Sequence, residues 1–141
     1  MGNAEMKTTF ETLSIRTHQR CEMIDLTDQV RRVVAAGGLA DGIVTVYCPH
    51  TTAAVTINEN ADPDVVHDIL LTLEALVPEH RAGYRHAEGN SDAHVKSSLL
   101  GPSQQVLVRE GRLQLGTWQA VYFCEFDGPR TRRVCIQMLG E

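Results

Sequence analysis

The sequence lacks the features typical of membrane-spanning proteins, secreted proteins and proteins with a structural zinc site. None of its apolar runs approaches the roughly 18 residues that a membrane-spanning helix needs, and the N-terminus carries no apolar segment typical of a signal peptide. The cysteines form no C-x-x-C pair and lie far apart among apolar and aromatic neighbours: Cys21, Cys48, Cys124 and Cys135. This distribution favours buried thiols in a reducing compartment over disulfides or a zinc centre. We therefore expect a soluble, cytoplasmic protein with no membrane partner.

Clustered positive charge is also scarce. The formal net charge is −5, and basic residues are scattered until the run Arg130-Thr131-Arg132-Arg133. Proteins that bind nucleic acids usually carry a face of Lys and Arg that neutralises phosphates. The sequence therefore predicts no nucleic-acid partner.

Internal repeats, low-complexity tracts and linkers are absent as well. The length of 141 residues suits a single domain, residues 1–141, and is large enough to bury a core without staples. The composition, 43% hydrophobic and 22% charged, is that of an ordinary globular protein.

The pattern of apolar residues predicts a mainly β (α+β) protein. Alternating or β-branched runs predict seven or eight strands within residues 8–17, 21–26, 43–48, 53–57, 105–109, 113–115, 118–126 and 133–139. One helix is predicted from the N-cap Thr27 to Gly37, and a second from Asp62-Pro63 to Val77. Two helices cannot cover both faces of a parallel sheet. We therefore expect an antiparallel β-sandwich or barrel with two flanking helices on one side.

The stretch from Tyr84 to Gly101 is the densest in chemically active side chains. Its centre, Glu88-Gly89-Asn90-Ser91-Asp92, is rich in turn-forming residues and predicts a loop. His86 and His94 would then lie at the two ends of the loop and face a common point. The alternative is a solvated polar loop without a site.

A second polar stretch begins at His50-Thr51-Thr52. Three neutral imidazoles with open positions can hold a catalytic divalent metal such as Zn or Mg, and His50, His86 and His94 are the candidates. Three carboxylates are candidates for further ligands or for groups that orient the imidazoles: Glu59, Asp62 and Asp92. The alternative is that these histidines only form hydrogen bonds in a polar pocket, because their spacing matches no metal-binding signature.

Several other side chains suit an anionic ligand. Lys96, Arg130 and Arg132 can bind phosphate oxygens, although an Arg at a turn is often simply solvated. Gln119 and Glu125 are six residues apart, so an unbroken strand would place both on one face. We therefore expect a small phosphorylated metabolite as a partner.

Four motifs in this order resemble the YjbQ-like family, described as secondary thiamine-phosphate synthases. They are His50-Thr51-Thr52-Ala53-Ala54, Asn58-Glu59-Asn60-Ala61-Asp62-Pro63, the segment from His86 to Gly101, and Leu115-Gly116-Thr117-Trp118-Gln119. The resemblance covers nearly the whole chain and implies a jelly-roll β-sandwich and a homotrimer. It also implies a transferase that joins a pyrimidine diphosphate to a thiazole phosphate and releases pyrophosphate.

With this activity, we expect His86 or His94 to act as general acid. The predicted catalytic set is His86, His94, Glu59 and Asp62, and the predicted substrate-binding set is Asn58, Lys96, Gln119, Glu125, Arg130 and Arg132. Because the polar stretches lie on separate loops, we expect them to converge at a boundary between subunits. The alternative function is a non-catalytic binder of a metal or a phosphorylated metabolite.

Overall fold

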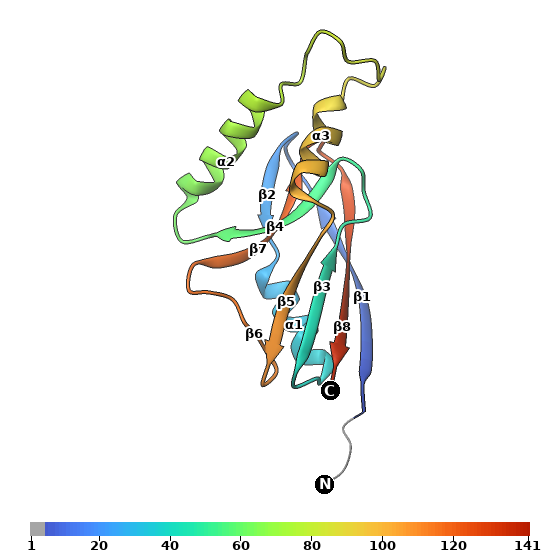
Figure 1. Cartoon of the computed structure of the whole chain (residues 1–141), viewed down its shortest axis with the longest axis vertical. Helices are drawn as coiled ribbons and strands as arrows, with labels where there is room; N and C mark the ends of the chain where they lie inside the picture. Colours follow the sequence, from blue (N-terminus) through green and yellow to red (C-terminus); the bar gives the residue numbers. More distant parts are fainter. Residues whose placement is uncertain (1–4) are drawn as a thin grey trace.

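The computed structural model describes residues 5–141, which form eight strands and three helices (Figure 1). The strands are β1 (Lys7–Arg16), β2 (Glu22–Asp25), β3 (Gly42–Tyr47), β4 (Ala53–Glu59), β5 (Ser103–Arg109), β6 (Arg112–Leu113), β7 (Gln119–Glu125) and β8 (Thr131–Gly140). The helices are α1 (Thr27–Gly37), α2 (Pro63–Leu76) and α3 (Ser91–Leu100). The mainly β prediction is confirmed, but three helices are present where two were predicted.

The strands form two antiparallel sheets. The larger sheet has the order β1-β8-β3-β5-β6, and the smaller sheet has the order β2-β7-β4. Pairing runs over the full length of β1 and β8, from Lys7 opposite Gly140 to Arg16 opposite Thr131. The N-terminal strand is therefore held along its whole length by the C-terminal strand.

Both sheets and α1 share one hydrophobic core. It contains β-branched and aromatic side chains from strands of both sheets, among them Val44, Val55, Phe123 and Ile136, together with Val30 and Val34 of α1. Cys48 and Cys124 are also buried, as predicted, while Cys21 and Cys135 are half-buried free thiols. Burial raises the pKa of the Cys48 thiol and raises that of Cys124 to about 12, so neither is a reactive thiolate at neutral pH.

The start of α1 differs in detail from the prediction. The helix begins at Thr27 and ends at Gly37, with Gly38 in the left-handed conformation at the C-cap. Thr27 does not cap the helix with its side chain. Its hydroxyl accepts a hydrogen bond of 3.0 Å from the backbone N–H of Val121 instead. The threonine therefore ties α1 to β7.

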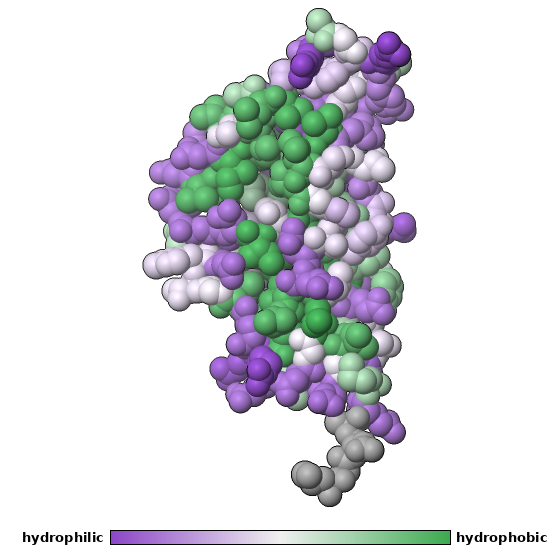
Figure 2. Space-filling model, viewed as in Figure 1, coloured by the Kyte–Doolittle hydropathy of each residue, from purple (hydrophilic) through white to green (hydrophobic). Residues whose placement is uncertain are grey.

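The start of α2 is as predicted. The Asp62 carboxylate accepts a 2.9 Å hydrogen bond from the Asp64 backbone N–H, and Pro63 occupies the first turn. None of the 14 residues of α2 is fully buried. Val66, Leu70 and Leu73 pack partly against a second small core, which contains Tyr122 and Phe126. Apolar surface consequently remains exposed over this helix (Figure 2).

The loop predicted around Glu88-Gly89-Asn90-Ser91-Asp92 is confirmed only up to Asn90. Its second part is wrong, because Ser91–Leu100 forms α3 and includes His94. The buried positions of α3 do have helical spacing, but most of them are polar: Asp92, Ala93, Lys96 and Ser97. These polar groups form hydrogen bonds with one another and with neighbouring elements. The segment therefore has no apolar stripe from which the helix could be predicted. No helix within residues 5–141 has the length and apolar character needed to cross a membrane.

Candidate functional site

A polar cleft of about 320 Å³ lies where the β3–β4 loop, the start of α3 and the start of β8 meet. Its lining contains four histidines and arginines that the sequence predicted: His50, His94, Arg130 and Arg132. The rest of the lining consists of Pro49, Thr51, Thr52, Glu88, Asn90 and Asp127. The cleft combines imidazoles and guanidinium groups, which can contact an anionic ligand, with the carboxylates of Glu88 and Asp127.

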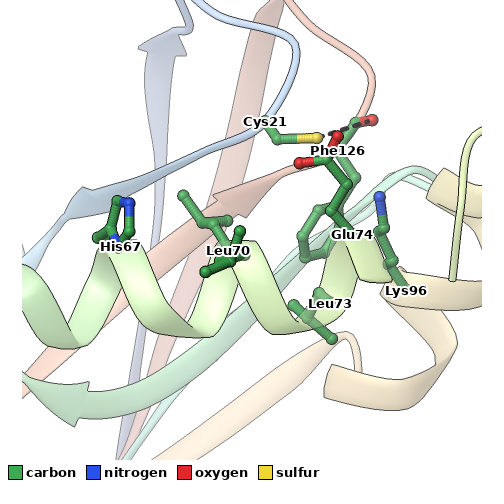
Figure 3. A pocket seen from close by; sticks show the side chains of 8 residues that line it. Cys21, His67, Leu70, Leu73, Glu74, Lys96 and Phe126 are labelled. Carbon is green, nitrogen blue, oxygen red and sulfur yellow. Dashed lines mark hydrogen bonds between the residues drawn. The ribbon is translucent and has the colours of Figure 1, made fainter. Parts of the chain in front are cut away.

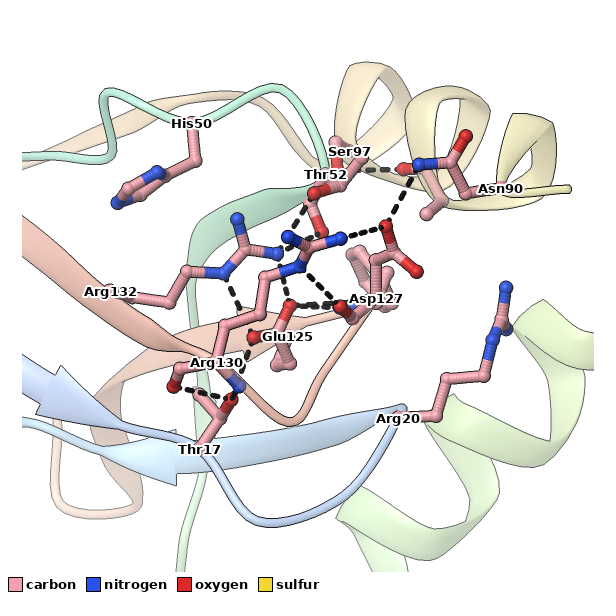
Figure 4. Close-up of polar contacts among 12 residues, drawn as sticks. Thr17, Arg20, His50, Thr52, Asn90, Ser97, Glu125, Asp127, Arg130 and Arg132 are labelled. Atoms are coloured by element: carbon pink, nitrogen blue, oxygen red, sulfur yellow. Dashed lines mark hydrogen bonds and ion pairs between the residues drawn. The ribbon is translucent and has the colours of Figure 1, made fainter. Parts of the chain in front are cut away.

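The Arg132 side chain is held from below by Glu125 (Figure 4). The Glu125 carboxylate is fully buried, and it accepts hydrogen bonds from Nε of Arg132 at 2.9 Å and from its Nη2. It also accepts from the Thr17 hydroxyl at 2.8 Å. Burial alone would raise the pKa of Glu125, but these hydrogen bonds lower it below the ordinary value. Glu125 therefore remains charged and positions Arg132, rather than lining the cleft itself.

Thr52 fixes the same guanidinium from above. Nη2 of Arg132 donates to the Thr52 hydroxyl at 2.8 Å, so this residue of the His-Thr-Thr motif has a defined structural task. Within residues 5–141, no group accepts a hydrogen bond from Nη1 of Arg132. A rigid guanidinium with one free N–H edge is well suited to an anion.

Arg130 is positioned in a similar way by Asp127. Its Nε donates to the Asp127 carbonyl at 2.8 Å, and its Nη2 lies 3.0 Å from the Asp127 carboxylate. The same carboxylate oxygen, Oδ2, accepts a 2.8 Å hydrogen bond from the Asn90 amide at the start of α3. Asp127 thus links the β7–β8 loop to α3. The sequence analysis treated Asp127-Gly128-Pro129 only as a turn and missed this role.

His50 is held as a neutral imidazole. Its Nε2 accepts a 3.0 Å hydrogen bond from the Arg133 backbone N–H, which leaves Nδ1 as the ring nitrogen that carries the proton. Partial burial and the nearby Arg132 charge lower the pKa of His50. At neutral pH His50 is therefore an uncharged hydrogen-bond donor at the wall of the cleft.

His86 and His94 do face a common point, as predicted. Their ring centroids are 5.3 Å apart in an edge-to-face arrangement, although His94 lies on α3 and not at the end of a loop. His86 lies just outside the cleft, where its Nε2 is 3.6 Å from the Glu88 carboxylate. Glu88 itself lines the cleft. The pair therefore offers two proton-transfer groups at one side of the cleft.

The three-histidine metal site does not fit the observed side chains. Among residues 5–141, no group of three or more His, Cys, Asp or Glu side chains is placed to hold a metal ion. The Nε2 of His50 is already engaged by the Arg133 N–H, and Arg132 adds positive charge beside it. His50, His86 and His94 therefore do not form a metal centre within residues 5–141 of one chain.

The remaining predicted residues lie elsewhere. Glu59 is opposite Gln119 at one end of the β4–β7 pair, whereas Ala53 is opposite Glu125 at the other end. A strand of this length spans about 20 Å at 3.3 Å per residue. Asn58, Glu59, Asp62 and Gln119 are therefore separated from the cleft within one chain. Gln119 accepts the Gly116 N–H at 2.8 Å, and Asp62 caps α2.

Lys96 is buried in an ion-pair network instead of facing a phosphate. Its Nζ donates to the Asp92 carboxylate at 2.9 Å, and that carboxylate also accepts two hydrogen bonds from Arg20, at 2.9 and 3.0 Å. Burial would raise the pKa of Asp92, but the hydrogen bonds from Arg20 and Lys96 lower it. Arg20 was missed by the sequence analysis, because its partner is 72 residues away.

A second cavity, of about 230 Å³, lies beside this network (Figure 3). Lys96 reaches it from α3, Cys21 and Phe126 line it from the body of the protein, and α2 contributes leucines and Glu74. Its lining is mainly apolar, in contrast to the polar cleft. The convergent polar groups of the candidate site are therefore those around His50 and Arg132.

Comparison with known proteins gave close relatives along nearly the entire chain. A family model described as UPF0047 protein YjbQ-like matches residues 11–141. The UPF0047 protein YugU of Bacillus subtilis is 54% identical over 130 residues, which cover 92% of this chain and 98% of that protein. A relative from Methanocaldococcus jannaschii is 47% identical over 127 residues, 90% of this chain and 91% of that protein.

Solved structures agree with the fold. A crystal structure of a YjbQ/UPF0047 protein from Clostridium acetobutylicum is 50% identical and superimposes with a TM-score of 0.89, covering 91% of this chain and 98% of that one. A protein of unknown function from Sulfolobus solfataricus is 34% identical and has a TM-score of 0.93, covering 97% of this chain and the whole of that one.

Proposed function

Because this chain belongs to the YjbQ-like UPF0047 family, we propose that the polar cleft is the active site of a transferase that resembles secondary thiamine-phosphate synthases. The proposed reaction joins a pyrimidine diphosphate to a thiazole phosphate and releases pyrophosphate. The resemblance supplies the substrates, and the cleft supports the class of reaction. Negative charge grows on the departing pyrophosphate, so catalysis requires fixed positive groups at that position.

The observation that carries the proposal is the pair of pre-positioned guanidinium groups. Arg130 is fixed by Asp127 and Arg132 by Glu125, and both line the cleft that His50 and His94 also line. Groups that are already held in place need not reorganise when charge develops, which is the main source of electrostatic stabilisation in enzymes. We propose that the two arginines bind the diphosphate.

Proton transfer falls to the histidine pair. His86 and His94 are in contact with each other, and His94 lines the cleft. Either imidazole can give a proton to the departing pyrophosphate, a contribution of roughly 100-fold to 10,000-fold in rate for a well-placed general acid. His50, which is neutral and tethered to Arg133, orients the ligand by donating from Nδ1.

An assay of the purified protein with both substrates tests the proposal. We expect the wild-type protein to form thiamine phosphate and the double variant His86→Ala, His94→Ala to lose at least 100-fold of the rate. His67→Ala is the matched control, because His67 lies on α2 and its side chain is 70% exposed. Equal product formation by the wild type and the double variant would contradict the proposal.

The second candidate is a non-catalytic binder of a phosphorylated metabolite or a metal. The same arginine pair favours it, because the cleft can bind an anion without turning it over. A thermal-shift screen with phosphorylated metabolites separates the two functions. A stabilising ligand recovered chemically unchanged supports binding, whereas recovered product supports catalysis.

We also propose three further properties that the sequence and the family resemblance imply. They are a jelly-roll arrangement of the sandwich, assembly as a homotrimer and a cytoplasmic location. A divalent metal, Zn or Mg, stays a prediction, and elemental analysis of protein purified without added metal or chelator tests it. Light scattering tests the trimer, for which we expect a mass three times the 15.6 kDa of one chain.

A further inference from the structure

The apolar cavity of about 230 Å³ between α2 and the second small core has no part in the proposed reaction. Helix α2 contributes Leu70, Leu71 and Leu73 to its lining, and the core contributes the buried Phe126. An apolar cavity of about 150 Å³ holds a benzene molecule. The cavity beside α2 is larger, so it has room for the hydrocarbon part of a small ligand.

One charged group is buried at this apolar cavity. The Lys96 side chain is only 3% exposed, and Figure 3 shows it projecting from α3 toward the side of the cavity where Cys21 and Phe126 lie. An ammonium carries three N–H donors. In the part of the chain that the structure describes, the Lys96 ammonium has a single acceptor, the Asp92 carboxylate at 2.9 Å. Buried donors are normally paired, so Lys96 has N–H groups available to a ligand.

The charge of Lys96 is also incompletely compensated. Arg20 donates to both oxygens of the Asp92 carboxylate, and Lys96 donates to Oδ2, which already accepts from Nη1 of Arg20. One buried negative charge therefore serves two positive charges. Glu79 lies 3.4 Å from Nε of Arg20, but its side chain is 45% exposed and contacts Arg20 and not Lys96. A buried cation in this situation favours a further anion beside it.

We propose that this cavity binds a small monocarboxylate with an apolar body, and that Lys96 contacts the carboxylate. Leu70, Leu73 and Phe126 surround the apolar body. A monocarboxylate brings one negative charge to one ammonium, whereas a phosphate dianion brings charge that an apolar lining cannot solvate. Glu74 also lines the cavity, but it is exposed, so solvent screens its charge.

The cavity is a different site from the polar cleft, although the two are close in the chain. Phe126 lines the cavity, and the next residue, Asp127, lines the cleft. Helix α3 likewise contributes Lys96 to the cavity and His94 to the cleft. A carboxylate can also contact the guanidinium of Arg130 in the cleft. Variants at Lys96 and Arg130 therefore distinguish the two sites.

Alkylation of Cys21 reports whether the cavity is occupied. Cys21 is a half-buried free thiol in the lining, whereas Cys135 is a half-buried free thiol outside the lining and serves as the internal control. N-ethylmaleimide labels the folded protein at increasing hexanoate concentration, and mass spectrometry of peptides gives the rate at each thiol. We expect hexanoate to slow the labelling of Cys21 saturably and to leave the rate at Cys135 unchanged. Hexylammonium, which has the same chain and the opposite charge, should protect Cys21 far less.

Two variants separate the contributions of charge and of space. Lys96→Met removes the ammonium and keeps an unbranched side chain, and it should weaken protection by hexanoate by about 10-fold to 100-fold. Leu70→Trp fills the cavity and leaves the ion pairs of Lys96 in place, so hexanoate should cause no further slowing of the labelling of Cys21. Arg130→Met is the matched control, because it removes a cation from the cleft, and it should respond as the wild type does.

Each outcome supports or overturns the inference. Equal labelling of Cys21 with and without hexanoate would overturn it, and so would equal protection by hexanoate and hexylammonium, because Lys96 would then not select the charge. Protection that is lost in Arg130→Met and kept in Lys96→Met would place the carboxylate in the cleft. If circular dichroism shows that Lys96→Met is unfolded, the comparison of the two ligands on the wild type decides the question.

The inference does not depend on the proposed reaction. The labelling rates are measured without either substrate of thiamine-phosphate synthesis. A protein that makes no thiamine phosphate can therefore still show protection of Cys21 by hexanoate, and an active enzyme can fail to show it. Failure of the proposed function and failure of the cavity site are thus observed separately.

Discussion

Replacement of Glu125 by Gln is the most direct test of how the cleft is built. Glu125 is 0% exposed and its carboxylate serves five donors: two nitrogens of Arg132, the Thr17 hydroxyl, and the backbone N–H groups of Phe126 and Asp127. The amide removes the negative charge and turns one acceptor into a donor. Arg132 is 6% exposed, so its positive charge would remain buried without a counter-ion.

The expected cost is about 3 to 5 kcal/mol of unfolding free energy, which is typical when one member of a buried ion pair is removed. At roughly 2.1 cal/mol/K of unfolding entropy per residue, a chain of 141 residues loses about 3 to 4 °C in Tm per kcal/mol. Glu125→Gln should therefore lower the Tm by about 10 to 17 °C. Calorimetry and urea unfolding at one fixed protein concentration measure both quantities, since association affects Tm.

A double-mutant cycle tests whether Glu125 holds Arg132 by charge. Glu125→Gln combined with Arg132→Met removes the unpaired charge, so the double variant should be more stable than the sum of the single effects predicts. Asp28→Asn is the control for an exposed pair with Arg31, and we expect a loss of at most about 0.5 kcal/mol. A loss below 1 kcal/mol for Glu125→Gln, or strict additivity in the cycle, would show that Glu125 does not hold Arg132 by charge.

Three further predictions concern stability. Asp92→Asn leaves the buried Lys96 ammonium without its counter-ion, so chemical unfolding should show a loss of about 3 to 5 kcal/mol of unfolding free energy. A loss as small as that of Asp28→Asn would contradict the buried network. Gly128→Ala places a Cβ in steric overlap with the Gln19 carbonyl oxygen, so the backbone must shift at a cost of about 1 to 3 kcal/mol. A thermal melt equal to that of the wild type would argue against this close approach. The folded-state pKa values of Glu125, Asp92 and His50 are all lowered, so the unfolded chain binds more protons than the folded protein. The free energy of unfolding should therefore fall below about pH 6.5, as His50 protonates in the unfolded state, and more steeply below about pH 4.5, as the two carboxylates do. A free energy of unfolding in urea that stays flat or rises from about pH 6.5 to about pH 3.5 would be inconsistent with this sign.

Local sequence patterns were sufficient for the strands, for two of the helices and for part of the cleft. The β-branched runs and the cap at Asp62-Pro63 are local signals, and the structure contains the strands and the helix start that they predict. Sequence also singled out His86 and His94, which are neighbours, and His50, Arg130 and Arg132, which line the cleft. The roles assigned to these five residues stay predictions.

Tertiary structure decided what those signals could not. Helix α3 buries Asp92 and Lys96. In the sequence these polar residues resemble a solvated segment, because Arg20, which pairs with Asp92, lies 72 residues away and approaches it only in the folded chain. Strand length separates Asn58, Glu59 and Gln119 from Glu125, because residues on one face of a strand can still lie about 20 Å apart. Glu125 lies beneath Arg132 instead of in the cleft, because a buried carboxylate needs several donors and only the folded chain supplies them. Periodicity shows which face a residue occupies, whereas the distance between two faces depends on how the sheets pack.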